Sequence, residues 1–392
     1  MTTFTKQQQA EYKSELERKE HYMYLTAIHD KIMNGLNANK NRSGERAIWE
    51  LMQNARDLAH PQGVNVAISL DENYINFTHD GQPFDNESLN GLVTQQSTKR
   101  SGDKEIAGQY GTGFMSTHVF SRKVYVSGEC KLQFQGMQTY VSLPENFCLD
   151  RTKDDLKEFN DELDREINSI KNLISLDGHD APAQPTTFRY PLTKEKREKV
   201  SQQLMTTTKL MPYVLVFNDR IASCTITNKV LGKCIKFIRK TTVCLDDDLH
   251  MTEIEADGKP LKIYWIASES EEDRIVIPPL PSGFDNTAEI PSEFLWFPML
   301  GTEDMGVNFI YHSSRLYPVE QRNSYQLPED NDATREKWVS NENVLLEMTD
   351  MLFKYYRDHT EQQNLPLDFA RVNFSCNYTK SLLSRKSRLR VL

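Results

Sequence analysis

Three polar residues, Glu50, Asn54 and Asp57, are spaced so that they lie along one stripe of a helix. A carboxylate and an amide one turn apart suit a hydrated divalent cation, because Mg²⁺ prefers oxygen ligands and keeps several waters. A nearby glutamate can take a proton from an attacking water. The spacing predicts a hydrolytic, metal-dependent site, whereas the same stripe taken alone is more often the solvated face of a helix.

A second, apolar stripe on the same segment must position these polar residues. Apolar side chains recur there at helical spacing, which predicts an amphipathic helix with one buried face. Its members are Ala47, Ile48, Leu51, Met52, Ala55, Leu58 and Ala59.

A glycine-rich stretch precedes the apolar run 114–120. Glycines let backbone N–H groups approach an anion closely, and a helix that begins there adds its positive end. We therefore expect this stretch to contact phosphate groups, although a single glycine run is more often a turn. Its residues are Gly108, Gln109, Tyr110, Gly111, Thr112, Gly113 and Phe114.

Taken in order, four segments resemble the signatures of the GHKL superfamily of ATPases, with the heat-shock chaperone and sacsin-like branches resembled most. Residues 50–57 resemble its Glu-x-x-x-Asn-x-x-Asp box and residues 79–84 its Asp-x-Gly-x-Gly turn. Residues 108–114 resemble its Gly-Gln-Phe-Gly-x-Gly-Phe box, and residues 185–190 resemble the Gly-Thr-x-hydrophobic strand that ends the domain. The order and spacing of all four make the resemblance specific.

The resemblance implies an α+β fold with a Bergerat-type two-layer α/β sandwich, in which helices cover a mixed sheet. The ATP-binding domain would occupy residues 1–195, and a middle or transducer-like α/β domain would occupy residues 196–375. A basic tail would follow at residues 376–392.

The resemblance also implies roles for individual residues, with ATP as the substrate and Mg²⁺ as the cofactor. Asn54 would hold Mg²⁺, Glu50 would activate the water, and the polar loop 85–107 would close as a lid over the phosphates. Arg322 would contact the γ-phosphate with its positively charged side chain, and Arg315 is the second candidate for this role. Further nucleotide contacts are expected from Asp57, Asp80, Gly81, Lys99, the glycine-rich residues 108–114, and Thr187, with Thr186 as the alternative threonine.

The turn at residues 79–84 departs from the family pattern. The aspartate that contacts the adenine amino group in the family falls on His79, and Asp80 comes one place later. Pro83 replaces a glycine. Two alternatives remain open: the turn is shifted so that Asp80 contacts adenine, or the base is recognised in another way.

The composition fits a protein of two domains. The chain has 392 residues, of which 38% are hydrophobic and 26% charged. A net charge of −9 argues against a chain-wide nucleic-acid surface and leaves only the basic tail for phosphate or an acidic partner. That tail contains Lys380, Arg385, Lys386, Arg388 and Arg390.

Six scattered cysteines without a C-x-x-C pair, together with the absence of an apolar leader, indicate free thiols and a cytoplasmic location.

The leading hypothesis is a slow ATPase that couples nucleotide state to conformational change, chaperone-like or part of a larger multidomain machine. The alternative is a nucleotide-sensing interaction module with negligible hydrolysis. A histidine kinase is disfavoured, because nothing before Glu50 resembles a phospho-acceptor helix. The GHKL resemblance further implies protein clients and a homodimer that forms with ATP.

Several elements follow from periodicity and breaker residues. We predict helices at 6–37, 154–173 and 194–211, the last ending at Pro212, and a closing amphipathic helix around 344–355. Predicted strands include 64–70, 74–78, 213–217 and 222–228, with 123–128 and 131–143 in one sheet.

Overall fold

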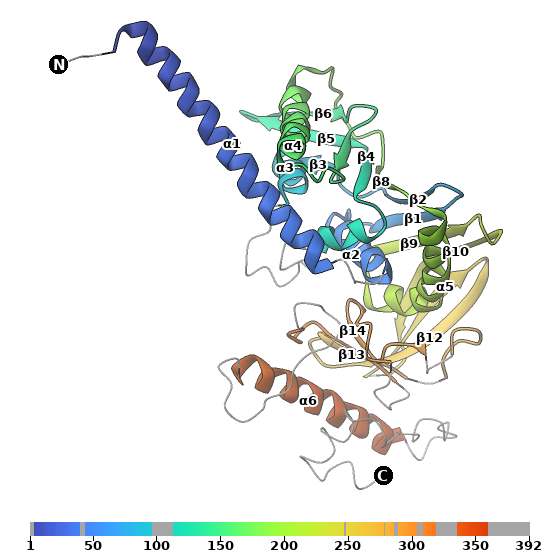
Figure 1. Ribbon diagram of the computed structural model, residues 1–392. Coiled ribbons are helices and arrows are strands. Elements are labelled where there is room, and N and C mark those ends of the chain that lie inside the picture. Colours follow the sequence, from blue (N-terminus) through green and yellow to red (C-terminus); the bar gives the residue numbers. More distant parts are fainter. Residues whose placement is uncertain are drawn as a thin grey trace. The chain divides into compact units, whose positions relative to one another are not determined.

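The computed structural model describes residues 4–39, 44–95, 113–246, 248–277, 279–285, 289–303, 309–318 and 335–359. The chain has the predicted α+β fold and divides into two compact units, each described separately below (Figure 1). Unit 1 comprises residues 1–60, 66–203 and 228–232, and unit 2 comprises residues 61–65, 204–227 and 233–392. In the described part of the chain, no helix combines the length and apolar character needed to span a membrane.

The main sheet of unit 1 has the strand order β1-β2-β8-β4-β7. Its strands are β1 (Val64–Leu70), β2 (Tyr74–His79), β4 (Lys123–Ser127), β7 (Cys148–Asp150) and β8 (Thr186–Pro191). The strands β1 and β2 confirm the predicted pair, and β2 and β8 run antiparallel with His79 opposite Thr186. Alternate residues of each strand are buried, so one face of this sheet packs against helical elements.

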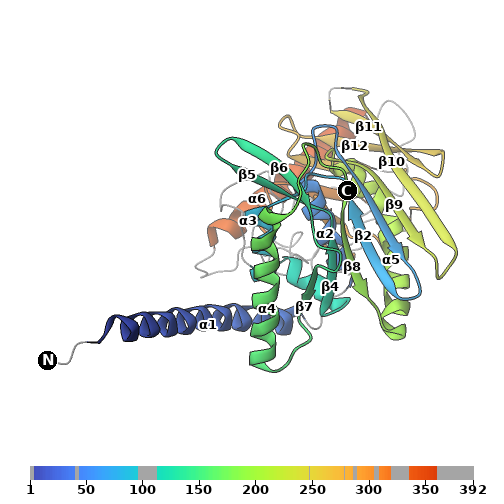
Figure 2. The ribbon, with the colours of Figure 1, turned by 90° about the horizontal axis from the view of Figure 1, so that it is seen from above.

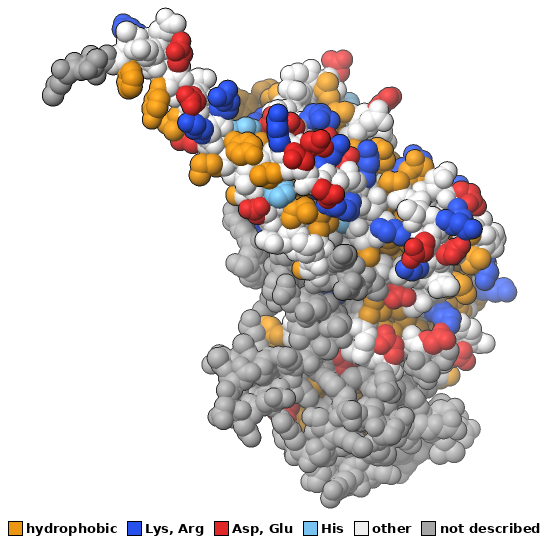
Figure 3. Space-filling view, viewed as in Figure 1, with side chains coloured by type: hydrophobic (Ala, Val, Ile, Leu, Met, Phe, Trp, Pro, Cys, Tyr) orange, Lys and Arg blue, Asp and Glu red, His pale blue; other side chains and the backbone are white. Residues whose placement is uncertain are grey.

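The helical elements of unit 1 include the long helix α1, which confirms the predicted N-terminal helix. They are α1 (Lys6–Asn39), α2 (Gly44–Asp57), α3 (Asn86–Thr94), η1 (Gly113–Val119), α4 (Leu156–Lys171) and η2 (Asn172–Ser175). Helix α4 packs against the middle of α1, where the His21 and Asp164 side chains approach to 2.7 Å (Figure 2). The first half of α1 is exposed, and apolar side chains such as Leu16 and Met23 lie open on it (Figure 3).

A small second sheet corrects the prediction that residues 123–128 and 131–143 belong to one sheet. Strands β3 (Phe84–Asp85), β5 (Glu129–Phe134) and β6 (Met137–Ser142) form a separate sheet in the order β3-β5-β6. Gln135 and Gly136, with φ of 49° and 82°, make the hairpin turn that splits the predicted strand. Gly128, with φ of 134°, separates β4 from β5.

Helix α3 corrects the prediction that residues 85–107 form a polar loop. Asp85 caps the helix by accepting a 2.7 Å hydrogen bond from the backbone N–H of Ser88. Leu89 and Val93, one turn apart, are fully buried. The apolar spacing and the cap outweigh the polar composition of this segment, and the rest of the predicted lid lies outside the described residues.

Helix α5 (Lys194–Phe217) corrects two predictions, because it continues through Pro212 and includes the predicted strand 213–217. Every side chain from Tyr213 to Phe217 is fully buried. A proline inside a helix costs about 3 kcal/mol, whereas burying each large apolar side chain contributes about 1.5–3 kcal/mol. Burial of this run therefore sustains the helix past the proline.

Unit 2 contains a sheet with the strand order β15-β14-β16-β13-β12-β11-β10-β9. Its elements are β9 (Ile221–Asn228), β10 (Lys233–Cys244), β11 (Leu249–Ala256), β12 (Lys259–Ala267), β13 (Asp273–Ile277), β14 (Glu293–Leu295), β15 (Phe297–Pro298), β16 (Ile310–Ser313) and the helix α6 (Arg335–His359). Leu345 and Met348 of α6 pack into one apolar cluster with Ile266 and Ile275 of the sheet, which confirms the predicted closing helix. Residues 376–392 lie outside the described part.

Candidate functional site

Helix α2 buries the predicted apolar stripe from Ala47 to Ala55 and packs against η1, whereas Leu58 and Ala59 follow the helix and are half-buried. Glu50 is only 6% exposed, whereas Asn54 and Asp57 are half-buried on the same helix. The carboxylate of Asp57 lies 3.6 Å from the guanidinium of Arg56. The helix therefore presents a carboxylate and an amide one turn apart in a partly desolvated setting, as the spacing predicts.

Glu50 meets the end of the glycine-rich stretch at Gly113. A Cβ atom at position 113 would lie 2.9 Å from Cδ of Glu50 and closer still to Oε2, so any side chain at this position would displace the Glu50 carboxylate. The other carboxylate oxygen, Oε1, accepts a hydrogen bond from Nη2 of Arg46, one turn earlier on α2. Arg46 thus holds one oxygen of Glu50, while the second oxygen faces Gly113.

The turn after β2 packs against the end of α2. The backbone N–H of Gln82 donates a 2.7 Å hydrogen bond to the carbonyl of Leu58. A Cβ at Gly81 would lie 2.7 Å from that same carbonyl oxygen, so the close approach requires glycine. The second signature therefore lies directly beside the first.

His79 and Asp80, the two residues considered for base recognition, have opposite environments. His79 is 1% exposed and points to the buried face of the sheet, whereas Asp80 is exposed. Among the described residues, neither ring nitrogen of His79 has a hydrogen-bond partner. Since buried polar atoms are nearly always paired, the His79 ring has an unused hydrogen-bonding capacity.

The two candidate threonines lie on opposite faces of the sheet. Thr186 is buried and pairs across the strands with His79. Thr187, the residue favoured by the sequence, points to the other face, where its hydroxyl lies 2.9 Å from that of Thr78. The side chain that shares a face with His79 is therefore Thr186.

Phe114 connects the glycine-rich stretch to the strand of the fourth signature. Its ring centroid lies 5.5 Å from that of Phe188 on β8, and Phe84 approaches Phe188 from the other side at 6.1 Å. Phe114 is buried, so it positions the start of η1 against the sheet.

Other predicted site residues lie outside the described residues or elsewhere in the fold. Arg315, in unit 2, donates a 3.1 Å hydrogen bond from Nε to Asp273 and forms an ion pair of 2.7 Å with Glu347. These two carboxylates raise its pKa above the usual range. Lys99, Gly108, Gln109, Tyr110, Gly111, Thr112 and Arg322 lie outside the described residues.

The donor set fits a magnesium ion that is held mainly by a nucleotide. Within the part of the chain that the structure describes, no group of three or more His, Cys, Asp or Glu side chains could hold a metal ion. Mg²⁺ in nucleotide sites is bound by one or two protein oxygens together with phosphates and waters. Asn54, one turn from Glu50, can supply such an oxygen.

Arg46 is a site residue that sequence reasoning missed. It precedes Glu50 by one helical turn, and residues at this spacing are neighbours on a helix surface. The signal was therefore present in the sequence, although the contact of Glu50 with Gly113 could not be seen there.

No protein-family model matches the chain, and a search of the curated proteins found no match. Fold and site therefore define the class only as an α+β protein with a glutamate and an asparagine on one partly buried helix.

His79 should make the stability of the protein depend on pH. Burial lowers its pKa from 6.5 to about 4, and the charge of Asp80 opposes this shift. The unfolded chain binds a proton near pH 6.5 that the folded chain does not bind until about pH 4, so stability falls as the pH decreases through this window. This residue should lower the free energy of unfolding by about 2 kcal/mol at pH 5 relative to pH 8.

Urea unfolding at these two pH values, for the natural chain and for His79→Phe, measures this contribution. Between pH 8 and pH 5, the free energy of unfolding should fall by about 2 kcal/mol less in the variant than in the natural chain. An equal decrease in the free energy of unfolding in both proteins would show that His79 does not cause the pH dependence.

Proposed function

We propose that this protein binds and hydrolyses ATP as a GHKL-type ATPase of Bergerat fold and couples nucleotide state to conformational change. One observation supports the proposal above all others. Segments that are far apart in the sequence come together: Gly113 contacts Glu50 of α2, and Gln82 bonds to Leu58, directly after α2. The fourth segment, in β8, pairs with β2. Each of these segments contains one of the four signatures that resemble those of the GHKL superfamily.

In the proposed reaction, Asn54 provides the protein oxygen for Mg²⁺, which supplies positive charge to the phosphates when it is bound. Glu50 takes a proton from the attacking water through Oε2, the oxygen that faces Gly113. Arg46 orients the carboxylate by holding Oε1. Gly113 has no side chain, and this leaves room for the Glu50 carboxylate itself.

Recognition of the base is assigned to the buried end of β2. His79 and Thr186 face the same side as Phe114, and His79 has unpaired ring nitrogens. A neutral imidazole has one donor and one acceptor, so it could pair with the amino group of adenine or with the carbonyl oxygen of guanine once the buried ring became accessible to the base. A selectivity for ATP over GTP would therefore have to come from Asp80.

The contact between Arg46 and Glu50 also favours a second function, a nucleotide sensor with negligible hydrolysis. A carboxylate oxygen that accepts a hydrogen bond from a guanidinium, as Oε1 of Glu50 does from Arg46, is not free to take a proton from water. The two functions predict opposite effects of removing Arg46. Either Arg46 orients the Glu50 carboxylate so that it can act as the general base, or it keeps this carboxylate from accepting a proton.

Arg46→Gln should lower the rate of ATP turnover by roughly ten- to a hundredfold, since a misplaced base loses much of its effect. Phosphate release under saturating ATP measures the effect. Arg18→Gln, which removes the same charge from the exposed part of α1, is the matched control and should leave turnover unchanged. A higher rate in Arg46→Gln would support the sensor instead.

A further inference from the structure

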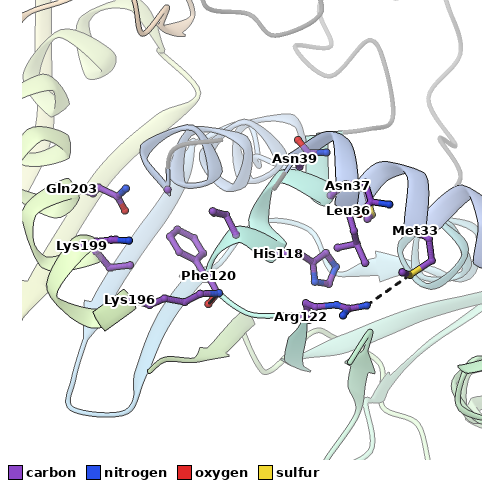
Figure 4. Close-up of a pocket in the computed structure, with 14 residues that line it drawn as sticks. Met33, Leu36, Asn37, Asn39, His118, Phe120, Arg122, Lys196, Lys199 and Gln203 are labelled. Atoms are coloured by element: carbon purple, nitrogen blue, oxygen red, sulfur yellow. Dashed lines mark hydrogen bonds between the residues drawn. The ribbon is translucent and has the colours of Figure 1, made fainter. Parts of the chain in front are cut away.

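The charged lining of one cavity in unit 1 is already paired within the chain. This cavity, of about 600 Å³, lies between the last turns of α1, residues 115–122 and the first turns of α5 (Figure 4). Its cations have these partners: Asp154 for Arg122, Glu195 for Lys199, and the carbonyl of Phe120 for Lys196. Because these contacts account for its charges, the cavity does not point to a ligand.

A second cavity lies on the opposite face of the unit 1 sheet from His79 and Thr186, and its volume is about 420 Å³. Pockets of 300–1,000 Å³ are typical of sites for small organic molecules. Strands β2, β8 and β4 and the loop before β7 form its lining. The lining contains neither Glu50 nor Asn54, so this cavity requires an explanation separate from the proposed ATP site.

Arg189 of β8 is the cation of this second cavity, and it is exposed. Its Cζ atom lies 3.7 Å from the centroid of the Tyr74 ring. A guanidinium stacked on an aromatic ring is held in place while its N–H groups remain available to a carboxylate. Among the described residues, no carboxylate pairs with Arg189. The side chain is therefore positioned to bind an anion from solution.

Glu145 is the carboxylate of the same lining, and it is exposed in the loop before β7. Within the described part of the chain it forms no ion pair, either with Arg189 or with another cation. Strand β4 keeps the two charges apart. On one side of β4, Tyr125 lies opposite Arg189, and on the other side the backbone N–H of Val126 donates a 2.9 Å hydrogen bond to the carbonyl of Phe147. Neighbouring strands lie about 4.8 Å apart, so the two charged residues are attached to backbone segments that are about 10 Å apart.

Opposite charges that face one cavity without pairing suit a small molecule that bears both a carboxylate and an ammonium group. The rings of Tyr74, Tyr125 and Phe147 in the lining favour an aromatic ligand. We propose that this cavity binds a free α-amino acid with an aromatic side chain. Its carboxylate would accept hydrogen bonds from Arg189, its ammonium group would donate to Glu145, and its ring would pack against Tyr125 between them.

L-Phenylalanine is a suitable probe, because two of its analogues each lack one charge. Phenylpropanoate lacks the ammonium group, and phenylethylamine lacks the carboxylate. Calorimetric titration of the full chain, without nucleotide or Mg²⁺, should show saturable binding of L-phenylalanine at millimolar concentrations. Each analogue should bind at least about tenfold more weakly, because it leaves one charged side chain of the cavity without its partner. This comparison needs only the natural chain.

Two variants assign each charge of the ligand to its residue. Arg189→Gln should weaken the binding of L-phenylalanine at least about tenfold and should no longer distinguish it from phenylethylamine. Glu145→Gln should weaken binding similarly and should no longer distinguish L-phenylalanine from phenylpropanoate. Arg165→Gln and Glu158→Gln, at exposed positions of α4 outside the cavity, are the matched controls. Asn54→Ala should leave this affinity unchanged even if it abolishes nucleotide binding, which separates this site from the ATP site.

The inference is overturned if L-phenylalanine does not bind at millimolar concentrations, or if either analogue binds as tightly to the natural chain. It is also overturned if Arg189→Gln and Glu145→Gln keep the affinity of the natural chain, or if Asn54→Ala removes binding. If circular dichroism shows that either variant is unfolded, Arg189→Lys and Glu145→Asp replace them. These keep the charges but shorten or change their reach, and they should also weaken binding.

Discussion

Asn54→Ala is expected to weaken the binding of a non-hydrolysable ATP analogue in the presence of Mg²⁺ at least about a hundredfold, or about 2.8 kcal/mol. The reason is geometric. Asn54 lies on α2 one turn from Glu50 and is half-buried. From this position its amide oxygen can bind a cation that is also bound by phosphates. Isothermal titration calorimetry of the full chain measures the effect.

The matched control is Asn168→Ala, which removes the same amide from the exposed surface of α4 and should bind normally. If the natural chain gives no heat and no thermal shift at millimolar nucleotide, the proposed function is wrong. The same titration, with ATP and GTP analogues, decides how the base is recognised. Normal affinity and selectivity in Asp80→Asn would leave recognition to His79.

Glu50→Gln should lower ATP turnover by about two to four powers of ten and leave nucleotide affinity nearly unchanged. Glutamine keeps the size of the side chain and can remain beside Arg46 and Gly113, but it cannot accept the proton of water. Steady-state phosphate release gives the turnover rate, and the titration described above gives the affinity.

Glu45→Gln provides the control for Glu50→Gln, because it neutralises a different glutamate on the same helix, one that is half-buried. It should retain turnover. If the natural chain releases no more phosphate than Glu50→Gln does, the sensor function becomes the better explanation. A loss of affinity equal to the loss of turnover would place Glu50 in binding and not in proton transfer.

Local features of the sequence determined the helix at the centre of the site. The apolar and polar stripes between Ala47 and Asp57 follow from helical periodicity alone, because both depend on residues within a few turns of each other. The same holds for the strands β1 and β2 and for α6. In each of these elements one face is buried at a single clear period, so the element and its buried side can be predicted together.

Short apolar runs were ambiguous, because they have no period that distinguishes a helix from a strand. The five residues from Tyr213 to Phe217 are apolar without a period, and such a run suits a buried strand or a buried helix equally well. Only the packing of these residues showed that they extend α5 past Pro212. In the segment 131–143, a hairpin at Gln135 and Gly136 depends on two positive φ angles that its strand-like pattern concealed.

Periodicity in the sequence determined the amphipathic α2, and the resemblance to the GHKL superfamily led to the α+β class and to the polar residues proposed to act on a phosphate. The tertiary structure decided which of them meet. It placed Glu50 against Gly113, put Thr186 instead of Thr187 beside His79, and buried His79 while leaving Asp80 exposed. These outcomes depend on contacts between segments distant in the chain, since residue spacing constrains which side chains share a face but not what that face packs against.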